Sequence, residues 1–236
     1  MNRHLKSAAL ISILPALLAT QTAAARSVDI EITNLTHALY FTPLLVTAHK
    51  PSLNLFEPGH PASPQLQEMA EGGELDGLLQ LASAAGAAST VNPAGGLLAP
   101  GAQTTVTGMK IKHHSQLSLM AMILPTNDGF VGLDNWTIPK KHGRYTVYLN
   151  AYDAGTEIND EVITGGGAPG VAGIPADPGG NSGTGATGVA TMEEHAKVHI
   201  HRGVIGDRDL DGGSSDLDDR VHHWLNPVAK VVIWVK

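Results

Sequence analysis

Three acidic residues lie beside glycines near the ends of two apolar segments. Asp128 directly precedes Gly129, and Asp153 lies two residues before Gly155, with Glu157 two residues further on. Carboxylates at strand ends, next to glycines that let the backbone turn back, are typical of loops that gather oxygen ligands around Ca²⁺. An Asp-Gly pair after a strand is also a common turn sequence. The residues alone therefore leave a calcium site and a plain turn both open.

A second acidic cluster occupies residues 207–219, with the sequence DRDLDGGSSDLDD. Asp207, Asp209 and Asp211 stand at positions 1, 3 and 5 of an EF-hand loop, Gly212 at position 6 and Asp218 at position 12. In such loops alternate side chains converge on Ca²⁺ and the glycine permits the sharp turn. The usual bidentate Glu is replaced by the shorter Asp, and no helical pattern flanks the loop. The cluster is interpreted either as a second, weaker calcium site or as a solvated acidic turn.

Histidines form the third group of candidate ligands. His199 and His201 lie two residues apart on a predicted strand, and His195 lies four residues before His199, so all three would face one side. His222 follows the acidic cluster. Imidazoles grouped in this way suit Zn²⁺ or Cu²⁺. The alternative to a calcium-binding protein is therefore a transition-metal-binding protein or metalloenzyme, and a further alternative is that these histidines only pack or bind water.

Sequence patterns of catalysis are otherwise missing. The chain has no Gly-x-Ser-x-Gly elbow, no His-Glu-x-x-His pair and no phosphate-binding glycine loop. It also has no cysteine, which removes thiolate ligands and cysteine nucleophiles. We therefore predict a protein that is not an enzyme and assign no catalytic residues, with Ca²⁺ as the expected cofactor.

The elements expected to position these residues are mainly strands. Segments that alternate apolar and polar residues, or are continuously apolar, are typical of strands. They span residues 28–33, 39–48, 103–107, 117–124, 144–152, 195–201 and 228–235. Such strands separated by loops indicate an all-β, antiparallel β-sandwich.

Two other segments differ in composition. Residues 63–83 carry a capping Ser63, a Pro64 suited to the first helical turn and apolar residues at helical spacing, interrupted at Gly72-Gly73. They predict a short helical insertion of two helices. Residues 164–190 consist mostly of Gly, Pro, Ala, Thr and Ser. They predict a flexible surface loop that contributes little to the core, and we assign no chemistry to it.

The N-terminus has the three parts of a secretory signal peptide. Arg3 and Lys6 precede an apolar run at residues 8–19, and residues 21–25 read QTAAA. The apolar run is too short for a membrane span, which needs about 20 residues. We predict a signal peptide at residues 1–25, a mature domain at residues 26–236 and a secreted or periplasmic location. Loss of Arg3 and Lys6, with no acid, would take the net charge from −7 to −9, which disfavours nucleic acid as a partner.

Two motifs resemble the spondin N-terminal domain family. Pro125-Thr-Asn-Asp128-Gly-Phe130-Val131-Gly132 is similar to its Pro-x-x-Asp-x-Phe/Trp-x-Val-Gly segment, and Tyr152-Asp-Ala-Gly-Thr-Glu157 to its Tyr/Trp-Asp-Ala-Gly-Thr-Asp/Glu segment. The opening strand, the helical insertion and the closing strand also resemble the family, so the likeness covers nearly all of residues 26–236.

The resemblance implies a fold and a ligand. Known members are sandwiches of about eight antiparallel strands, similar to calcium-dependent lipid-binding domains, and bind one calcium ion through three acidic residues. Those positions correspond to Asp128, Asp153 and Glu157, where the last is Asp in vertebrate members. The vertebrate cysteine pattern and thrombospondin repeats are absent, so cell adhesion transfers poorly. We expect a role in cell-surface or matrix interaction, with an extracellular or envelope protein or glycan as the unknown partner.

Overall fold

The structure is a computed structural model that describes residues 26–236 except 112, 181 and 193–194. The predicted signal peptide at residues 1–25 lies outside the described residues. The described chain contains ten strands and three helices, and every pair of neighbouring strands is antiparallel. The prediction of an all-β sandwich with a short helical insertion is confirmed.

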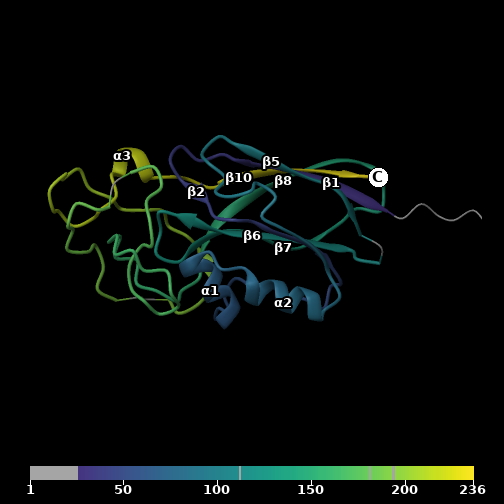
Figure 1. The fold of residues 1–236 in the computed structure, drawn as a ribbon, viewed down its shortest axis with the longest axis horizontal. Helices are drawn as coiled ribbons and strands as arrows, with labels where there is room; N and C mark the ends of the chain where they lie inside the picture. The colour runs from purple at the N-terminus through teal and green to yellow at the C-terminus, as the bar shows by residue number, and fades with distance from the viewer. Residues whose placement is uncertain (1–25, 112, 181, 193–194) are drawn as a thin grey trace, which may run out of the picture.

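The strands follow one hydrogen-bonded path, β4-β3-β6-β7-β8-β10-β1-β5, folded into two layers (Figure 1). One layer contains β5 (Gln103–Lys110), β1 (Ser27–Asn34) and β10 (Ala229–Val235). The other contains β4 (Ala88–Val91), β3 (Leu45–His49), β6 (Gln116–Leu124) and β7 (Gly129–Thr137). Two short strands lie off this path, β2 (Tyr40–Phe41) beside β6 and β9 (His199–Ile200) beside β8.

The long strand β8 (Gly143–Asp153) joins the two layers. Its first part, up to Leu149, pairs with β10, whereas residues 150–153 pair with the start of β7. In that second ladder Gly129 is the partner of Asp153 and Phe130 is the partner of Tyr152. This register places Asp128 next to the end of β8, although the two motifs are 25 residues apart in the chain.

Strand β6 is buried on both faces, which explains why its sequence is continuously apolar instead of alternating. Leu119, Ala121 and Ile123 belong to the core between the layers. Met120 and Met122 belong to a second core, formed with α1 (Pro64–Gly72) and α2 (Asp76–Ala84). Figure 1 shows these two helices on the outer side of the β6–β7 layer.

The helical insertion forms as its sequence predicts. The Ser63 side chain accepts a hydrogen bond from the Leu66 amide at 3.2 Å, Pro64 occupies the first turn, and Gly73 ends α1 in the left-handed conformation. Leu66, Met69 and Leu78 are the largest of the apolar residues that the two helices bury.

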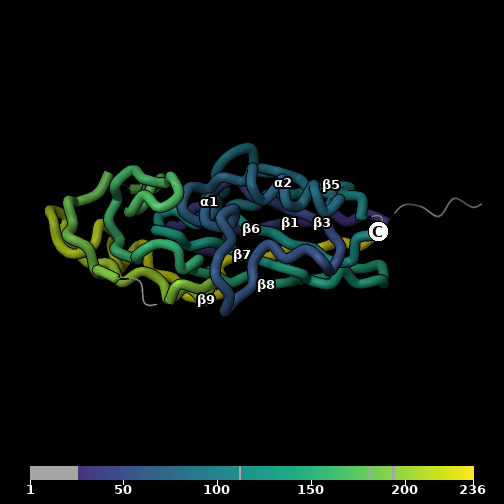
Figure 2. The backbone as a smooth tube through the Cα atoms, turned by 90° about the horizontal axis from the view of Figure 1, so that it is seen from below, coloured from purple at the N-terminus to yellow at the C-terminus, as the bar shows by residue number. Residues whose placement is uncertain are grey.

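Residues 154–228, between β8 and β10, form a loop-rich lobe at one end of the molecule, drawn green to yellow in Figures 1 and 2. Within this lobe the structure describes only β9 and the short helix α3 (Asp219–His222) as regular elements. The strand predicted at residues 195–201 is therefore much shorter than expected. Strands β4 and β7 were not predicted, because β4 is half exposed and β7 begins in the Asp-Gly motif. No helix of the described chain is long and apolar enough to cross a membrane.

Candidate cation site

Asp128 lies at the base of the site. It is fully buried, and its Oδ2 accepts hydrogen bonds from the amides of Thr156 and Glu157, at 2.8 and 3.2 Å, and from the Thr156 hydroxyl at 3.2 Å. The turn after β8 therefore wraps around this carboxylate. The backbone bond from the Ala154 amide to the Asp128 carbonyl, at 3.2 Å, closes the same junction.

The other two predicted ligands come from that turn. Asp153, the last residue of β8, is buried and accepts hydrogen bonds from the Gly155 amide at 2.8 Å and the Asn159 side chain at 2.7 Å. Gly155 has φ +67°, and a Cβ there would lie 2.4 Å from the His195 carbonyl oxygen, so the turn requires glycine. Glu157 is buried as well, and its Oε1 accepts from the Asn127 side chain at 3.3 Å.

The electrostatics of this group are unfavourable for three negative charges. Burial, and then the nearby charge of Asp153, hold the pKa of Asp128 well above its ordinary value, and Glu157 acts in the same direction. Burial raises the pKa of Glu157 to about 7, with smaller contributions from Glu71 and Asp160. Buried carboxylates close to one another are held in their charged form only when a cation or further hydrogen-bond donors balance them.

Two carboxylate oxygens of this group are buried without a hydrogen-bond partner. They are Asp128 Oδ1 and Glu157 Oε2. Leaving such an acceptor buried and unpaired is costly, so each is a candidate cation ligand. As the side chains stand, however, no three His, Asp or Glu groups among the described residues converge on a position for a metal ion. The remaining oxygens are engaged by Asn127, Asn159 and backbone amides, which a bound cation would have to displace in part.

The glycine-rich segment 164–190 contacts the site, which the sequence interpretation missed. The amide of Gly173 donates to Glu157 Oε1, and the amide of Gly170 donates to the buried carboxylate of Glu71 at 2.6 Å. Ile174 is fully buried and belongs to the core between the layers. The segment has no helix or strand among its described residues, as expected of a loop, but the expectation that it contributes little to the core is wrong at Ile174.

The second acidic cluster is held mainly by its own backbone. The Asp207 carboxylate accepts from the amides of Asp209, Ser214 and Ser215, at 2.7 to 2.9 Å. Asp209 accepts from the Asp211 amide at 3.2 Å. The backbones of Asp207 and Asp218 pair in an isolated parallel β-bridge.

The side chain of Asp218 is already engaged. It caps helix α3 and binds the Arg220 guanidinium at 2.5 Å, and the hydrogen bonds from Arg220 lower its pKa to about 2. The structure therefore brings Asp207 and Asp218 close but directs Asp218 to an arginine.

The predicted histidine group divides into separate places. His195 and His199 are in ring contact, with centroids 5.6 Å apart, and His199 Nε2 lies 3.8 Å from Asp153 Oδ2. His201 is buried against Trp224, and burial lowers its pKa to about 3, so its imidazole is neutral. His222 lies elsewhere, with Nε2 3.5 Å from Asp177 Oδ2.

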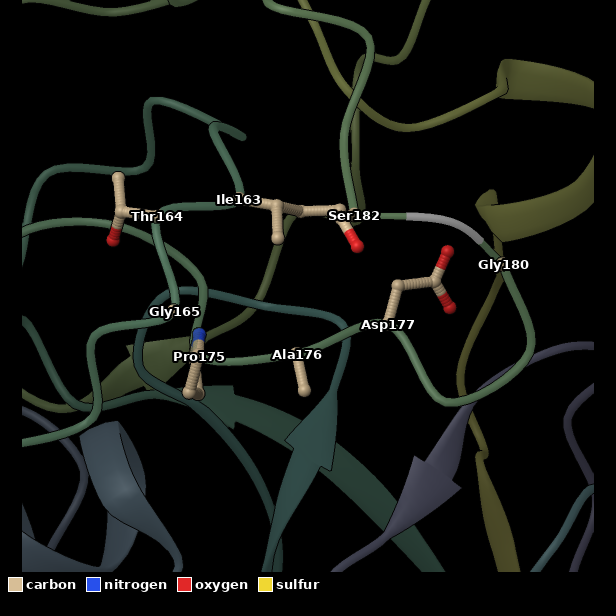
Figure 3. Close-up of a pocket in the computed structure, with 8 residues that line it drawn as sticks. All are labelled: Ile163, Thr164, Gly165, Pro175, Ala176, Asp177, Gly180 and Ser182. Atoms are coloured by element: carbon tan, nitrogen blue, oxygen red, sulfur yellow. The ribbon is translucent and has the colours of Figure 1, made fainter.

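Asp177 borders two pockets in the loop-rich lobe. Figure 3 shows the first, of about 390 Å³, in which Asp177 and Ser182 face the space between the loops. The second, of about 250 Å³, lies between Asp177, His222 and the acidic cluster. Neither pocket includes Asp128, Asp153 or Glu157.

Sequence reasoning also missed the residues that tie the site to the lobe. Asn127 donates to Glu157 and to Asp160, and its side-chain oxygen accepts from the Glu161 amide at 3.2 Å. The buried Glu161 carboxylate then accepts from the Gly206 amide at 2.8 Å and the Ser215 hydroxyl at 2.6 Å. Asn127 is adjacent to Asp128, which was the available signal, whereas nothing local marks Glu161 as buried.

Comparison with protein families gives one match. A family model described as Spondin_N matches residues 33–161, which is more than half of the chain. The chain belongs to the spondin N-terminal domain family. The match to this spondin domain contains Asp128, Asp153 and Glu157, and it ends before the histidine pair and the acidic cluster. A comparison with curated proteins found no match.

Proposed function

We propose that this spondin domain is an exported, non-enzymatic calcium-binding protein that holds one ion through Asp128, Asp153 and Glu157. The observation that carries the proposal is the burial of three carboxylates around the end of β8, two of which keep an oxygen without a hydrogen-bond partner. Oxygen ligands of this type suit Ca²⁺ better than a softer metal. The position of all three residues inside the family match supports the same proposal.

The hydrogen bonds of the site suggest how binding would proceed. Asp128 Oδ2 is fixed by three donors from residues 156 and 157, so its Oδ1 is oriented by the fold. Glu157 has a longer side chain, held by Asn127 and Gly173 through one oxygen only. A cation would therefore be received by Asp128, and Glu157 would rotate toward it and release part of its contact with the glycine-rich segment.

The rim of the site includes a pocket that a partner could contact. His195, His199 and Arg202 border a pocket of about 470 Å³ that also contains Asn159, a partner of Asp153. Calcium held by Asp128, Asp153 and Glu157 would order the turn after β8 and the lobe that this turn supports. We propose that the ordered lobe contacts an extracellular or envelope protein or glycan at the cell surface or in a matrix.

Thermal unfolding with chelator and with excess calcium tests this function. A ligand present at about 100 times its dissociation constant stabilises the folded state by about 2.7 kcal/mol. For a chain of this length that corresponds to a rise in melting temperature of about 5–10 °C. The rise should be absent in Asp153→Asn and retained in Asp76→Asn, an exposed residue of α2. Equal melting temperatures with chelator and with calcium in the unmodified protein would contradict the proposal.

The transition-metal alternative is tested in the same samples. The structure leaves only His195 and His199 beside Asp153, since His201 and His222 lie apart from that pair. Stoichiometric zinc or copper in the purified protein, lost in His199→Gln, would favour this alternative. Calcium without either metal would favour the proposal.

A further inference from the structure

A buried hydrogen-bonded chain connects β3, β6 and β7 away from the cation site. His49, the last residue of β3, and Ser118 of β6 are both fully buried. His49 Nε2 lies 2.7 Å from Ser118 Oγ, and Ser118 Oγ lies 2.8 Å from Asp134 Oδ1 on β7. Asp134 is six residues after Asp128, roughly 20 Å along an extended strand.

The other atoms of these three side chains are also engaged. His49 Nδ1 lies 2.8 Å from the Lys50 carbonyl oxygen, which can only accept. Ser118 Oγ accepts from the Asn135 amide at 3.0 Å. Asp134 Oδ1 also accepts from the Leu55 amide at 3.2 Å, and Asp134 Oδ2 accepts from the Asn135 side chain at 2.8 Å.

These contacts can all be satisfied only with a particular number of protons. The bond to the Lys50 carbonyl needs a proton on His49 Nδ1. Ser118 can donate only once, so it can satisfy either His49 Nε2 or Asp134 Oδ1, and the remaining neighbour must donate to it. With a neutral imidazole and an ionised carboxylate, two acceptors would face each other at about 2.8 Å, close to the usual hydrogen-bond length. All contacts are satisfied only when the group holds one additional proton.

We propose that His49, Ser118 and Asp134 share one proton at neutral pH, and that this proton fastens the turn after β3 to β6 and β7. The proton has two positions. In one, His49 is an imidazolium that donates to Ser118, and Ser118 donates to an ionised Asp134. In the other, a protonated Asp134 donates to Ser118, and Ser118 donates to neutral His49.

The surroundings favour retention of this proton. Burial raises the pKa of the Asp134 carboxyl, while its hydrogen bonds with Ser118, Leu55 and Asn135 and the nearby charge of His49 act in the opposite direction. Among the described residues, the other titratable groups on or next to the elements packed against His49 include the exposed Lys50 after β3, the exposed His113 and the largely buried His114 before β6, and the exposed Asp76 on α2. Strand β4, which pairs with β3, has none between Ala88 and Val91.

Loss of the proton would affect one segment in particular. Asp134 and Asn135 anchor residues 53–55, through the Leu55 amide and through the Asn135 side chain, which donates to the Leu53 carbonyl at 3.1 Å and to Asn54. In the unfolded chain histidine loses its proton near pH 6.5 and Asp is ionised. Above that pH the folded group therefore binds one proton more than the same residues bind in the unfolded chain. The free energy of unfolding then falls as pH rises, until the folded group releases its proton.

Nuclear magnetic resonance of ¹⁵N-histidine and ¹³C-aspartate tests the shared proton directly in residues 26–236. At about pH 7.5 we expect one of two signatures, a doubly protonated His49 with an ionised Asp134, or an Nδ1-protonated His49 with a protonated Asp134. His49→Gln and Asp134→Asn assign the two resonances, and the protein unfolded in urea is the control, with neutral histidine and ionised aspartate. A neutral His49 beside an ionised Asp134 in the folded protein would overturn the proposal.

A second measurement uses the pH dependence of melting. In Asp134→Asn the amide nitrogen can donate to Ser118 without a titrating proton, so the decline in melting temperature between about pH 6.5 and 9 should be smaller than in the unmodified protein. An equal decline in both proteins would also overturn the proposal. If Asp134→Asn does not fold, the Asp134 resonance is assigned in the unmodified protein through its contacts with Ser118 and Asn135, and the resonance measurement still decides.

Discussion

Replacing Glu157 by glutamine should change stability in opposite directions with and without calcium. Burial raises the pKa of Glu157 to about 7, from about 4.3 in an unfolded chain. The folded state therefore binds this proton more tightly, and without a cation its stability falls as pH rises from about 4.3 through about 7. Above that range a fully desolvated carboxylate would cost about 3–4 kcal/mol, and screening by solvent reduces the cost to about 1–3 kcal/mol.

Glutamine removes this charge and keeps the acceptor for Gly173 and Asn127. In chelator at about pH 8, Glu157→Gln should therefore unfold at a higher denaturant concentration than the unmodified protein, by an amount equivalent to about 1–3 kcal/mol. In excess calcium the order should reverse, because the variant lacks a ligand. Below about pH 4 the two metal-free proteins should be equally stable, since both side chains are then neutral.

Urea unfolding followed by tryptophan fluorescence measures both effects. Glu74→Gln is the matched control, because Glu74 lies in an exposed position after α1 and should change neither curve. A Glu157→Gln variant that is less stable than the unmodified protein in chelator would refute the reasoning about the buried charge. A variant that calcium still stabilises fully would refute the assignment of Glu157 as a ligand.

Three further substitutions test other parts of the account. Ile174→Ala should destabilise the protein by about 2–4 kcal/mol in chemical unfolding, because Ile174 is fully buried, whereas the exposed Val171→Ala should have little effect. Ser63→Ala should cost about 1 kcal/mol through loss of the cap of α1. Asp209→Ala should abolish only a second, weaker class of calcium sites in titration calorimetry, and a single class unaffected by it would leave residues 207–219 as an acidic turn.

The sandwich could be predicted from sequence because its signals are local. Alternation in β1, the continuous apolar run of β6 and the cap at Ser63 each reflect the surroundings of a single element. Strand β7 was missed because its first residues were interpreted as a turn motif, and the strand becomes evident only through pairing with β6 and β8. At Asn34 a local pattern is misleading. Residues 34–36, Asn-Leu-Thr, match a glycosylation acceptor triplet, but the Asn34 side chain is buried and donates hydrogen bonds to the carbonyls of Leu39 and Leu98.

The arrangement of the candidate residues was only partly predictable for a related reason. Two motifs marked Asp128, Asp153 and Glu157 as candidates, and the β7–β8 register places Asp128 beside the end of β8, where Asp153 lies. The contacts of Gly173, Glu71 and Glu161 depend on how loops distant in sequence pack, which composition does not encode. The proton shared by His49, Ser118 and Asp134 also requires three strands to be aligned before it can be recognised.

Equilibrium binding of ⁴⁵Ca²⁺ to residues 26–236 tests the central proposal most directly. The unmodified protein should bind one ion at the site near Asp128, in addition to any bound weakly by residues 207–219. Asp128→Asn should bind exactly one ion fewer than the unmodified protein under the same conditions, while Asp76→Asn should bind the same number. Equal binding by Asp128→Asn and the unmodified protein would contradict the proposed calcium site.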